Sequence, residues 1–171
     1  MELRNDELIL RSAPSIQELG GILKNYVKEK TNPKPGKNMS EKKGVLIDTN
    51  IVIRFLTGDD EKLYKQAEKI MADLEQNAIK AMMLEPVLAE CVYILKGVYG
   101  VERAMIAMLL RKILSLKVLK IPNKPIYFKA LDYFESQNLD FVDCLLLAFS
   151  QHKAGELLSF DKKLLSPLSS K

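Results

Sequence analysis

The sequence predicts an α/β fold in which one parallel sheet carries helices on both of its faces. From Gly44 onward, short apolar segments rich in β-favouring residues alternate with longer segments of helical periodicity. The first of them, Val45–Ile47, is apolar throughout and runs directly into Asp48, as a buried parallel strand would. A chain of 171 residues, 47% of them hydrophobic, can bury one such core, so one domain plus an appendage is expected.

The same alternation sets the expected elements of the folded part, residues 44–171. Asp59 and Asp60 are expected to cap the helix that begins at Glu61. Strands are expected at 45–48, about 79–83, about 117–121 and 156–159, and helices at 50–57, 60–76, 86–98, 101–116, 125–137, 141–153 and 161–165.

Residues 1–30 are expected to form a short strand followed by an amphipathic helix. Ser15 and Glu18 fit a helix-starting capping box. Gly20 and Gly21 weaken this helix by about 1 kcal/mol each relative to alanine, so it needs a surface to lie against. Its apolar face consists of Ile16, Leu19, Leu23, Tyr26 and Val27.

Residues 31–43, with several lysines, two prolines and a glycine, are expected to be an extended linker. Residues 1–43 carry nine Lys or Arg against six Asp or Glu, and residues 44–171 carry seventeen against sixteen. The folded part is nearly neutral, so any binding of nucleic acid must depend on where its basic side chains lie. No apolar run reaches the roughly 18 residues of a membrane span, and no apolar signal core is present, so a soluble, cytoplasmic protein without a membrane partner is expected.

Four acidic residues lie at positions that suggest a functional role, two at the ends of expected strands and two on apolar helical faces. Asp48 closes the first expected strand and Asp161 the last, at the edge where ligands of parallel α/β sheets bind. Glu90 and Asp143 each lie on an apolar helical stripe, where a charge is costly unless something satisfies it. The stripes are Val87, Cys91, Ile94 and Val98 around Glu90, and Leu139, Val142, Leu146 and Leu147 around Asp143. If the two strands are near neighbours, the four carboxylates converge.

Such crowding predicts a bound cation. Two like charges 4 Å apart repel by about 4 kcal/mol at an effective dielectric constant near 20. Mg²⁺ or Mn²⁺, which prefers carboxylate and water ligands, removes the conflict and favours metal-assisted phosphodiester hydrolysis. The alternative is that the acids are separate caps and surface charges, with Asp48 as the N-cap of the next helix. Cys91 and Cys144 have no metal-pairing neighbour and are expected to be buried structural thiols.

The segments that carry these acids resemble the PIN-domain ribonucleases, and within them the VapC-like toxins of prokaryotic toxin–antitoxin pairs, over about residues 44–166. The resembling segments are Val45-Leu46-Ile47-Asp48-Thr49-Asn50, residues 54–60, residues 88–95, residues 139–148 and Leu158-Ser159-Phe160-Asp161.

The resemblance implies a PIN-like three-layer α/β/α sandwich with a short central parallel sheet, and an Mg²⁺- or Mn²⁺-dependent endoribonuclease that acts on RNA. It also implies an antitoxin partner and a homodimer. It makes Asp48, Glu90, Asp143 and Asp161 the catalytic, metal-binding carboxylates, supported by Thr49, Asn50 and Ser159. Ser159 departs from the commoner threonine but keeps the hydroxyl. Asp140 also matches an acid of the subfamily, and capping is preferred to metal binding for it.

Substrate contacts are harder to assign. Arg54 lies one helical turn after Asn50 and could meet a phosphate, or it could pair with Asp59 or Asp60. Lys62, Lys65 and Lys69 share a helical face that is either solvated or phosphate-binding.

Residues 5–30 resemble the end of an AbrB-type antitoxin, with Asp6–Arg11 as its last strand and Ser15–Lys24 as its toxin-binding tail. We hypothesise that this tail docks on the domain, in cis or on a dimer mate, and inhibits it. The expected contacts are Ile16, Leu19, Leu23, Tyr26 and Val27, with Lys24 and Lys28 reaching the acidic centre. The alternative is an ordinary helical extension that completes the core.

Rival functions fit less well. A haloacid-dehalogenase-like phosphatase needs a second acid two residues after the first, where this chain has Asn50. A phospho-receiver domain needs an aspartate after a mid-sheet strand, where Lys120-Ile121-Pro122 stands. A catalytically idle module that binds RNA or protein stays open.

Overall fold

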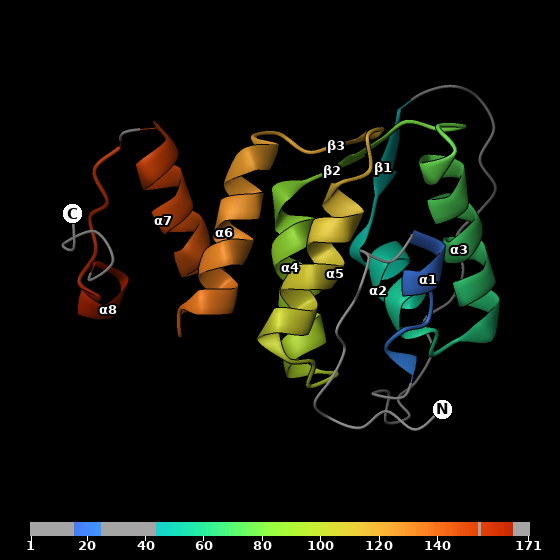
Figure 1. The fold of residues 1–171 in the computed structure, drawn as a ribbon, viewed down its shortest axis with the longest axis horizontal. Coiled ribbons are helices and arrows are strands. Elements are labelled where there is room, and N and C mark those ends of the chain that lie inside the picture. The colour runs from blue at the N-terminus through green and yellow to red at the C-terminus, as the bar shows by residue number, and fades with distance from the viewer. Residues whose placement is uncertain (1–15, 25–43, 154, 166–171) are drawn as a thin grey trace.

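The computed structural model describes residues 16–24, 44–153 and 155–165, which form three parallel strands and the helices around them (Figure 1). The expected α/β class with a short parallel sheet is confirmed. The strands are β1 (Val45–Ile47), β2 (Ala81–Met83) and β3 (Leu119–Lys120). The helices are α1 (Ile16–Leu19), α2 (Thr49–Thr57), α3 (Glu61–Glu75), α4 (Glu85–Gly97), α5 (Arg103–Leu114), α6 (Lys124–Ser136), α7 (Phe141–Lys153) and α8 (Lys162–Leu165).

The sheet has the order β1-β2-β3, with Leu46 opposite Met82 and Met82 opposite Lys120. Side chains alternate between its faces. The inner positions Ile47, Ala81, Met83 and Leu119 are buried in the core. The outer positions are exposed, with Leu46 at 64% and Met82 at 40%, so helices cover this second face only in part.

The fourth strand expected at 156–159 is wrong: residues 155–160 have no regular secondary structure. The apolar run at 157–160 predicts burial, but Leu158 is 83% exposed and Phe160 fully exposed. Within the described ranges, no strand pairs with the free edge of β1. A strand that lacks both partner and burial loses the contacts that stabilise it.

Helix boundaries follow the local sequence. Helix α2 ends at Thr57 because Gly58 adopts a left-handed conformation, with φ 59°, and its N–H bonds to the Arg54 carbonyl oxygen. The Asp60 carboxylate caps α3 by accepting from the Leu63 N–H at 2.9 Å, as expected, whereas the Asp59 carboxylate pairs with Arg54 and does not cap the helix. On the outer face of α3, exposed Lys65 pairs with Glu61 at 2.8 Å, which favours the solvated reading of that face.

The N-terminal segment, residues 16–24, packs onto α2 and α3 and enlarges the core (Figure 1). Three of its side chains, Ile16, Leu19 and Leu23, are buried. Two of its backbone N–H groups bind the last turn of α2: Gly21 donates to the Phe55 carbonyl at 2.7 Å, and Leu23 to the Leu56 carbonyl at 2.9 Å. Those carbonyls have no partner within their own helix, so the segment also serves as its C-terminal cap.

The helix of this segment is shorter than expected and ends at Leu19. Gly21 has φ +66°, which breaks the helix. At Gly20, a Cβ atom would lie 2.6 Å from the Tyr64 hydroxyl and 3.1 Å from a Phe55 ring carbon. The glycine pair therefore reverses the chain and permits close packing. Tyr26, Val27 and Lys28 lie outside the described residues.

Helices α6 and α7 pack against each other beyond α5 (Figure 1). Arg103 at the start of α5 holds their connection: its guanidinium donates to the carbonyls of Phe134 at 2.7 Å, Gln137 at 2.8 Å and Leu139 at 2.5 Å. It also stacks 3.9 Å above the Phe134 ring centre. Across the described ranges, no helix has the length and apolar character that a bilayer crossing requires.

Candidate active site

Asp48 stands directly after β1, at the N-cap position of α2, with an extended backbone. Its side chain makes no capping bond to the helix. One carboxylate oxygen instead accepts from the Asn50 side-chain amide at 3.2 Å, and the residue is exposed. The capping alternative therefore does not describe this side chain, which is open to a ligand.

Glu90, on α4, lies beside Thr49, the residue that follows Asp48. The buried Thr49 hydroxyl donates to a Glu90 carboxylate oxygen at 2.5 Å. The expected stripe around Glu90 is wrong, because the buried residues of α4 are Leu88, Cys91, Val92 and Leu95, one position around the helix. Glu90 is consequently exposed at the edge of that face and is not embedded in it.

The Cys91 thiol shows that the Asp48 and Glu90 charges act on one region. Burial raises the pKa of this thiol, and the Glu90 and Asp48 carboxylates raise it further. Cys91 and Cys144 are both buried and free, as expected of structural thiols. For Cys144, burial raises the pKa to about 11. Neither thiol is a nucleophile at neutral pH.

Asp143 and Asp161 form a second acidic pair, between α7 and the start of α8. Burial raises the pKa of Asp143, and the Asp161 and Asp140 carboxylates raise it further. Asp161 accepts from the Lys163 backbone N–H at 2.8 Å, and its own N–H donates to the Ser159 hydroxyl at 3.0 Å. The Ser159 hydroxyl thus supports Asp161.

The structure brings the four carboxylates together as two pairs and not as one cluster. Among the described residues, no group of three or more His, Cys, Asp or Glu side chains is close enough to hold a metal ion. Helices α7 and α8 lie at one end of the molecule and β1 and α2 toward the other, with α6, α5 and α4 between them (Figure 1). The expected convergence required the last strand to lie near the first, and that strand is absent from residues 155–160.

Asp140, which precedes α7, forms an ion pair with a residue of α4. One of its carboxylate oxygens lies 3.1 Å from the Lys96 ammonium at the end of α4, in an exposed ion pair. Its backbone carbonyl accepts the N–H of Cys144 at 3.0 Å, which starts α7.

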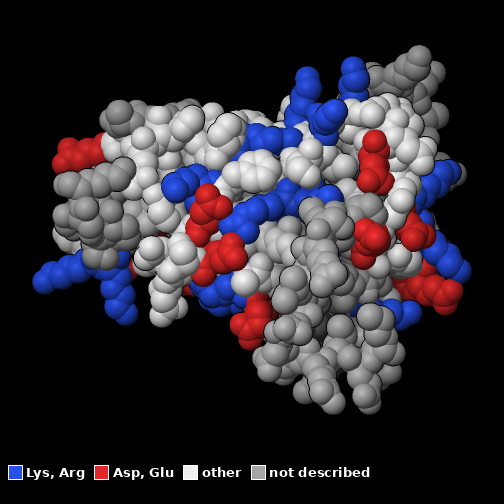
Figure 2. Space-filling model, in the orientation of Figure 1, with Lys and Arg blue, Asp and Glu red and all other residues white. Residues whose placement is uncertain are grey.

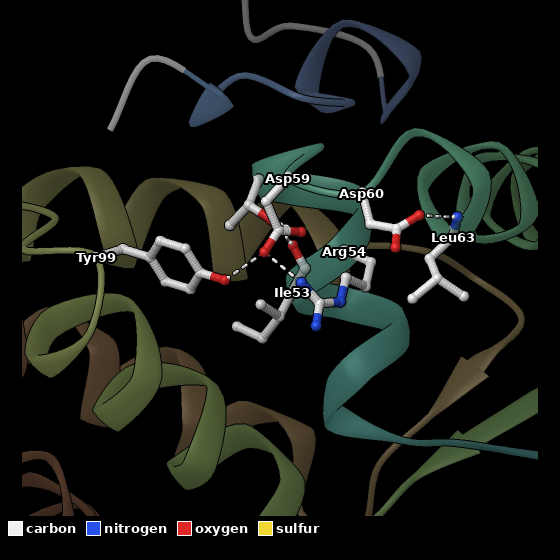
Figure 3. A network of polar contacts seen from close by, with 7 residues as sticks. Ile53, Arg54, Asp59, Asp60, Leu63 and Tyr99 are labelled. Atoms are coloured by element: carbon white, nitrogen blue, oxygen red, sulfur yellow. Dashed lines mark hydrogen bonds and ion pairs between the residues drawn. The ribbon is translucent and has the colours of Figure 1, made fainter. Parts of the chain in front are cut away.

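Arg54 takes part in a polar network at the end of α2. Its guanidinium pairs with the Asp59 carboxylate, and its side chain is only 12% exposed (Figure 3). The alternative pairing with Asp59 is confirmed, and the phosphate contact stays a prediction. Asp59 also accepts from the Tyr99 hydroxyl at 2.8 Å and the Thr57 hydroxyl at 3.0 Å. We refer to Arg54, Thr57, Asp59 and Tyr99 as the Asp59 network.

The Asp59 network ties the end of α2 to the loop after α4. Burial alone would raise the pKa of Asp59, but the hydrogen bonds from Arg54, Tyr99 and Thr57 and the Arg54 charge outweigh it and lower this pKa. Nothing in the sequence marks Tyr99 as a partner, because it lies 40 residues from Asp59.

Lys24 does not reach Asp48 or Glu90. Its side chain lies beside Gly58, at the C-terminal end of α2, and its charge acts on the Glu61 carboxylate, whose pKa is lowered chiefly by the Lys65 hydrogen bond. Asp48 is at the opposite end of the same helix. Residues 16–24 pack on the domain of their own chain, and the structure does not place Lys24 at the acids.

The chain is similar to known proteins in sequence. A family model described as "PIN domain" matches residues 45–166. A "VapC ribonuclease" from Aquifex aeolicus (strain VF5) is 30% identical over 120 residues, which covers 69% of this chain and 87% of the relative. No solved structure matches the chain. The match spans β1 to α8 and both acidic pairs, and the chain belongs to the PIN-domain family.

Proposed function

We propose that the chain is a divalent-metal-dependent endoribonuclease that hydrolyses RNA phosphodiester bonds, and that it is the toxin component of a toxin–antitoxin pair. The observation that carries the proposal is the Asp48–Glu90 pair, held at the end of β1 by Thr49 and Asn50. The PIN-domain match and the likeness to a relative named VapC ribonuclease support it.

The donor set fits a hard cation. Mg²⁺ is commonly bound in proteins through one or two carboxylates, with water and substrate phosphate filling its other positions. Asp48 and Glu90 supply exposed oxygen ligands of this kind. Asp143 and Asp161 are proposed as further metal-binding and catalytic carboxylates, on the strength of the resemblance. Bound Mg²⁺ or Mn²⁺ would activate water and neutralise charge on the phosphate.

The other residues have orienting roles. The Thr49 hydroxyl fixes one Glu90 oxygen, and the Asn50 amide fixes one Asp48 oxygen, so that each carboxylate keeps a second oxygen for a ligand. The Ser159 hydroxyl accepts the backbone N–H of Asp161 and so fixes the backbone that carries this carboxylate. Such fixed orientation reduces the reorganisation that the reaction requires.

The partners follow from the same proposal. RNA is the substrate and an antitoxin, or the chain's own N-terminal segment, is the inhibitor. The docked residues 16–24 anchor the segment on α2 and α3, and residues 25–28 are proposed to carry the inhibitory contact. A homodimer in the cytoplasm is proposed from the resemblance alone.

Cleavage of single-stranded RNA in Mn²⁺, Mg²⁺ or EDTA tests the proposal. We expect cleavage only with a divalent ion, its loss in Asp48→Asn and Asp143→Asn, and unchanged thermal melting of both variants. Asp132→Asn, an exposed acid paired with Arg111 on the surface, is the matched control and should cleave normally.

Undiminished cleavage by Asp48→Asn would overturn the site. Binding of RNA without any cleavage would instead favour the second candidate, a catalytically idle PIN-like module that binds RNA or protein. A phosphatase is disfavoured by the amide of Asn50 at the position of its second acid.

A further inference from the structure

The outer face of the sheet is open beside Asp48. Leu46 and Asp48 project from the same side of β1, because positions two apart in a strand share a face. The neighbouring β2 adds Met82 and, just beyond its end, Leu84, and these apolar side chains are exposed at 40% and 46%. We call this surface, Leu46, Met82 and Leu84 with the lysines described next, the outer sheet face.

Two exposed lysines lie on this face. Lys80 precedes β2 on the same side as Met82, and Lys120 lies across β2 from Leu46, directly opposite Met82. In the part of the chain that the structure describes, neither lysine has a carboxylate partner within salt-bridge distance. Figure 2 shows basic side chains gathered along the upper edge of the molecule, where Figure 1 places the strands.

The spacing suits a polymer that runs toward Asp48. Lys120 stands two strand spacings, about 10 Å, from Leu46, and Asp48 is about 7 Å further along β1. Together these offsets put the backbone of Lys120 about 12 Å from that of Asp48. The Lys120 ammonium can therefore contact a phosphate close to the one that meets Asp48. The opposite charge of lysine and phosphate is what selects a nucleic acid.

The apolar side chains select a single strand. A duplex keeps its bases stacked inside and would offer this face only phosphates and sugars. An unstacked strand can set ribose and base surfaces on Leu46 and Met82 while its phosphates meet the lysines. With no aromatic residue on this face, contacts are expected to be largely independent of base sequence.

We propose that the outer sheet face binds the backbone of single-stranded RNA through Lys80 and Lys120 and leads it to Asp48 and Glu90. This inference rests on the proposed function in one respect, that the bound RNA is the substrate of the nuclease. Binding of RNA to the outer sheet face does not depend on cleavage. Lys80 and Lys120 are positioning residues, since they lie away from the reacting phosphate.

Fluorescence anisotropy of a labelled 12-nucleotide RNA tests the proposal. The full chain carrying Asp48→Asn is used in EDTA, with the RNA checked for intactness on a gel. In that background, Lys80→Gln/Lys120→Gln should weaken binding at least tenfold at low salt. The slope of log K against log salt concentration should fall by about 1.4, or about 0.7 per lost phosphate contact.

The matched control is Lys62→Gln/Lys69→Gln, which removes two exposed lysines from α3. It should bind within twofold of the parent. Leu46→Ser should weaken binding without a change in salt slope, because it removes an apolar contact. In the cleaving enzyme, Lys80→Gln/Lys120→Gln should raise KM and leave kcat unchanged.

Unchanged affinity and slope in Lys80→Gln/Lys120→Gln would overturn the proposal, as would an equal loss in the control pair. Equally tight, equally lysine-dependent binding of duplex RNA would overturn the assignment to single strands. A dimer in light scattering that Leu46→Ser dissociates would show that a second copy covers the face. Lysine-dependent binding without cleavage would support the outer sheet face and count only against the proposed nuclease.

Discussion

The Thr49 hydroxyl donates a hydrogen bond of 2.5 Å to a carboxylate oxygen of Glu90, 41 residues further along the chain. It joins the first turn of α2 to α4 at the end of β1. Because Thr49 is buried and Glu90 exposed, the hydroxyl holds the carboxylate at the surface in one orientation.

Thr49→Val should therefore lower metal affinity and cleavage by about 10- to 100-fold, the usual cost of losing an orienting partner of a metal ligand. Valine has nearly the same shape, so the melting temperature should change little beyond the lost hydrogen bond. Thr49→Ser keeps the hydroxyl and should retain most activity. A Mn²⁺ titration of cleavage measures the effect, and an unshifted midpoint in Thr49→Val would remove the hydroxyl from the site.

The carboxyl end of β1 was predictable from the sequence, and the buried face of α4 was not. The position of Asp48 after β1 follows from the sequence, because an apolar run between Gly44 and a carboxylate is typical of a buried strand and its end. In α4, the expected stripe that begins at Val87 and the buried stripe that begins at Leu88 both contain Cys91, and both have helical periodicity. Which stripe is buried depends on the elements packed against the helix, and local sequence does not contain that information.

The two acidic pairs show the same limit. Asp143 is in the first turn of α7, and it lies near Asp161 because the chain after α7 runs back along that helix to α8 (Figure 1). Their distance from Asp48 depends on how α6 packs on α5 and on whether residues 155–160 pair with β1. Those are long-range choices, and an apolar run at 157–160 is consistent with either outcome.

The Asp59 network predicts a pH-dependent stability. The pKa of Asp59 is lowered on folding, so its stabilising contribution is complete above the pKa of an unfolded aspartate, about 3.9, and is lost as the pH falls through the lower folded pKa. Asp59→Asn should cost about 2–3 kcal/mol at pH 7, because the poorly exposed Arg54 guanidinium loses its counter-ion.

Urea unfolding of the parent and Asp59→Asn at pH 7 and at about pH 3.5 measures this difference, which should shrink on acidification. Tyr99→Phe removes a single hydrogen bond and should cost about 1 kcal/mol. If the difference between parent and Asp59→Asn were the same at both pH values, the carboxylate charge would have no part in the stability.

Gly20→Ala should detach the N-terminal segment. The new methyl group would lie 2.6 Å from the Tyr64 hydroxyl and 3.1 Å from the Phe55 ring. Overpacking of this kind costs about 1–3 kcal/mol. Limited proteolysis after Lys24 or Lys28 should become faster, and thermal stability should fall.

Gly44→Ala is the control, since nothing lies within 4 Å of its added methyl group. Combining Gly20→Ala with Tyr64→Phe removes the nearer clash and should recover part of the lost stability. A Gly20→Ala protein as stable and as protease-resistant as the parent would contradict the close packing of the segment on α3.

Inhibition by the N-terminal segment makes a separate prediction. Deleting residues 1–38 should raise nuclease turnover several-fold while the fold survives. Because Ile16, Leu19 and Leu23 belong to the core, the deletion should also lower stability, and circular dichroism is needed beside the activity assay.

Point variants separate inhibition from stability. Lys24→Ala should leave turnover unchanged, because Lys24 lies at the end of α2 remote from Asp48. Lys28→Ala should raise it if the residues after Lys24 reach the acids. No rise in either Lys28→Ala or the deletion would leave residues 16–24 as a structural extension of the core.

The contacts of Arg103 predict that activity depends on a residue that belongs to neither acidic pair but orders the start of α7. Its forked guanidinium binds three carbonyls between the end of α6 and the start of α7 and stacks on Phe134. Lysine cannot reproduce this planar fork, so Arg103→Lys should cost about 2 kcal/mol and loosen the start of α7, which carries Asp143. Cleavage should fall more than the loss of folded protein explains.

Arg111→Lys is the matched change, because Arg111 makes partly exposed ion pairs with Asp132 and Glu135 that are worth at most about 1 kcal/mol. Unfolding curves and turnover per folded molecule should separate the two variants. If Arg103→Lys lost stability but kept full turnover per folded molecule, the position of α7, and with it Asp143, would not limit the reaction.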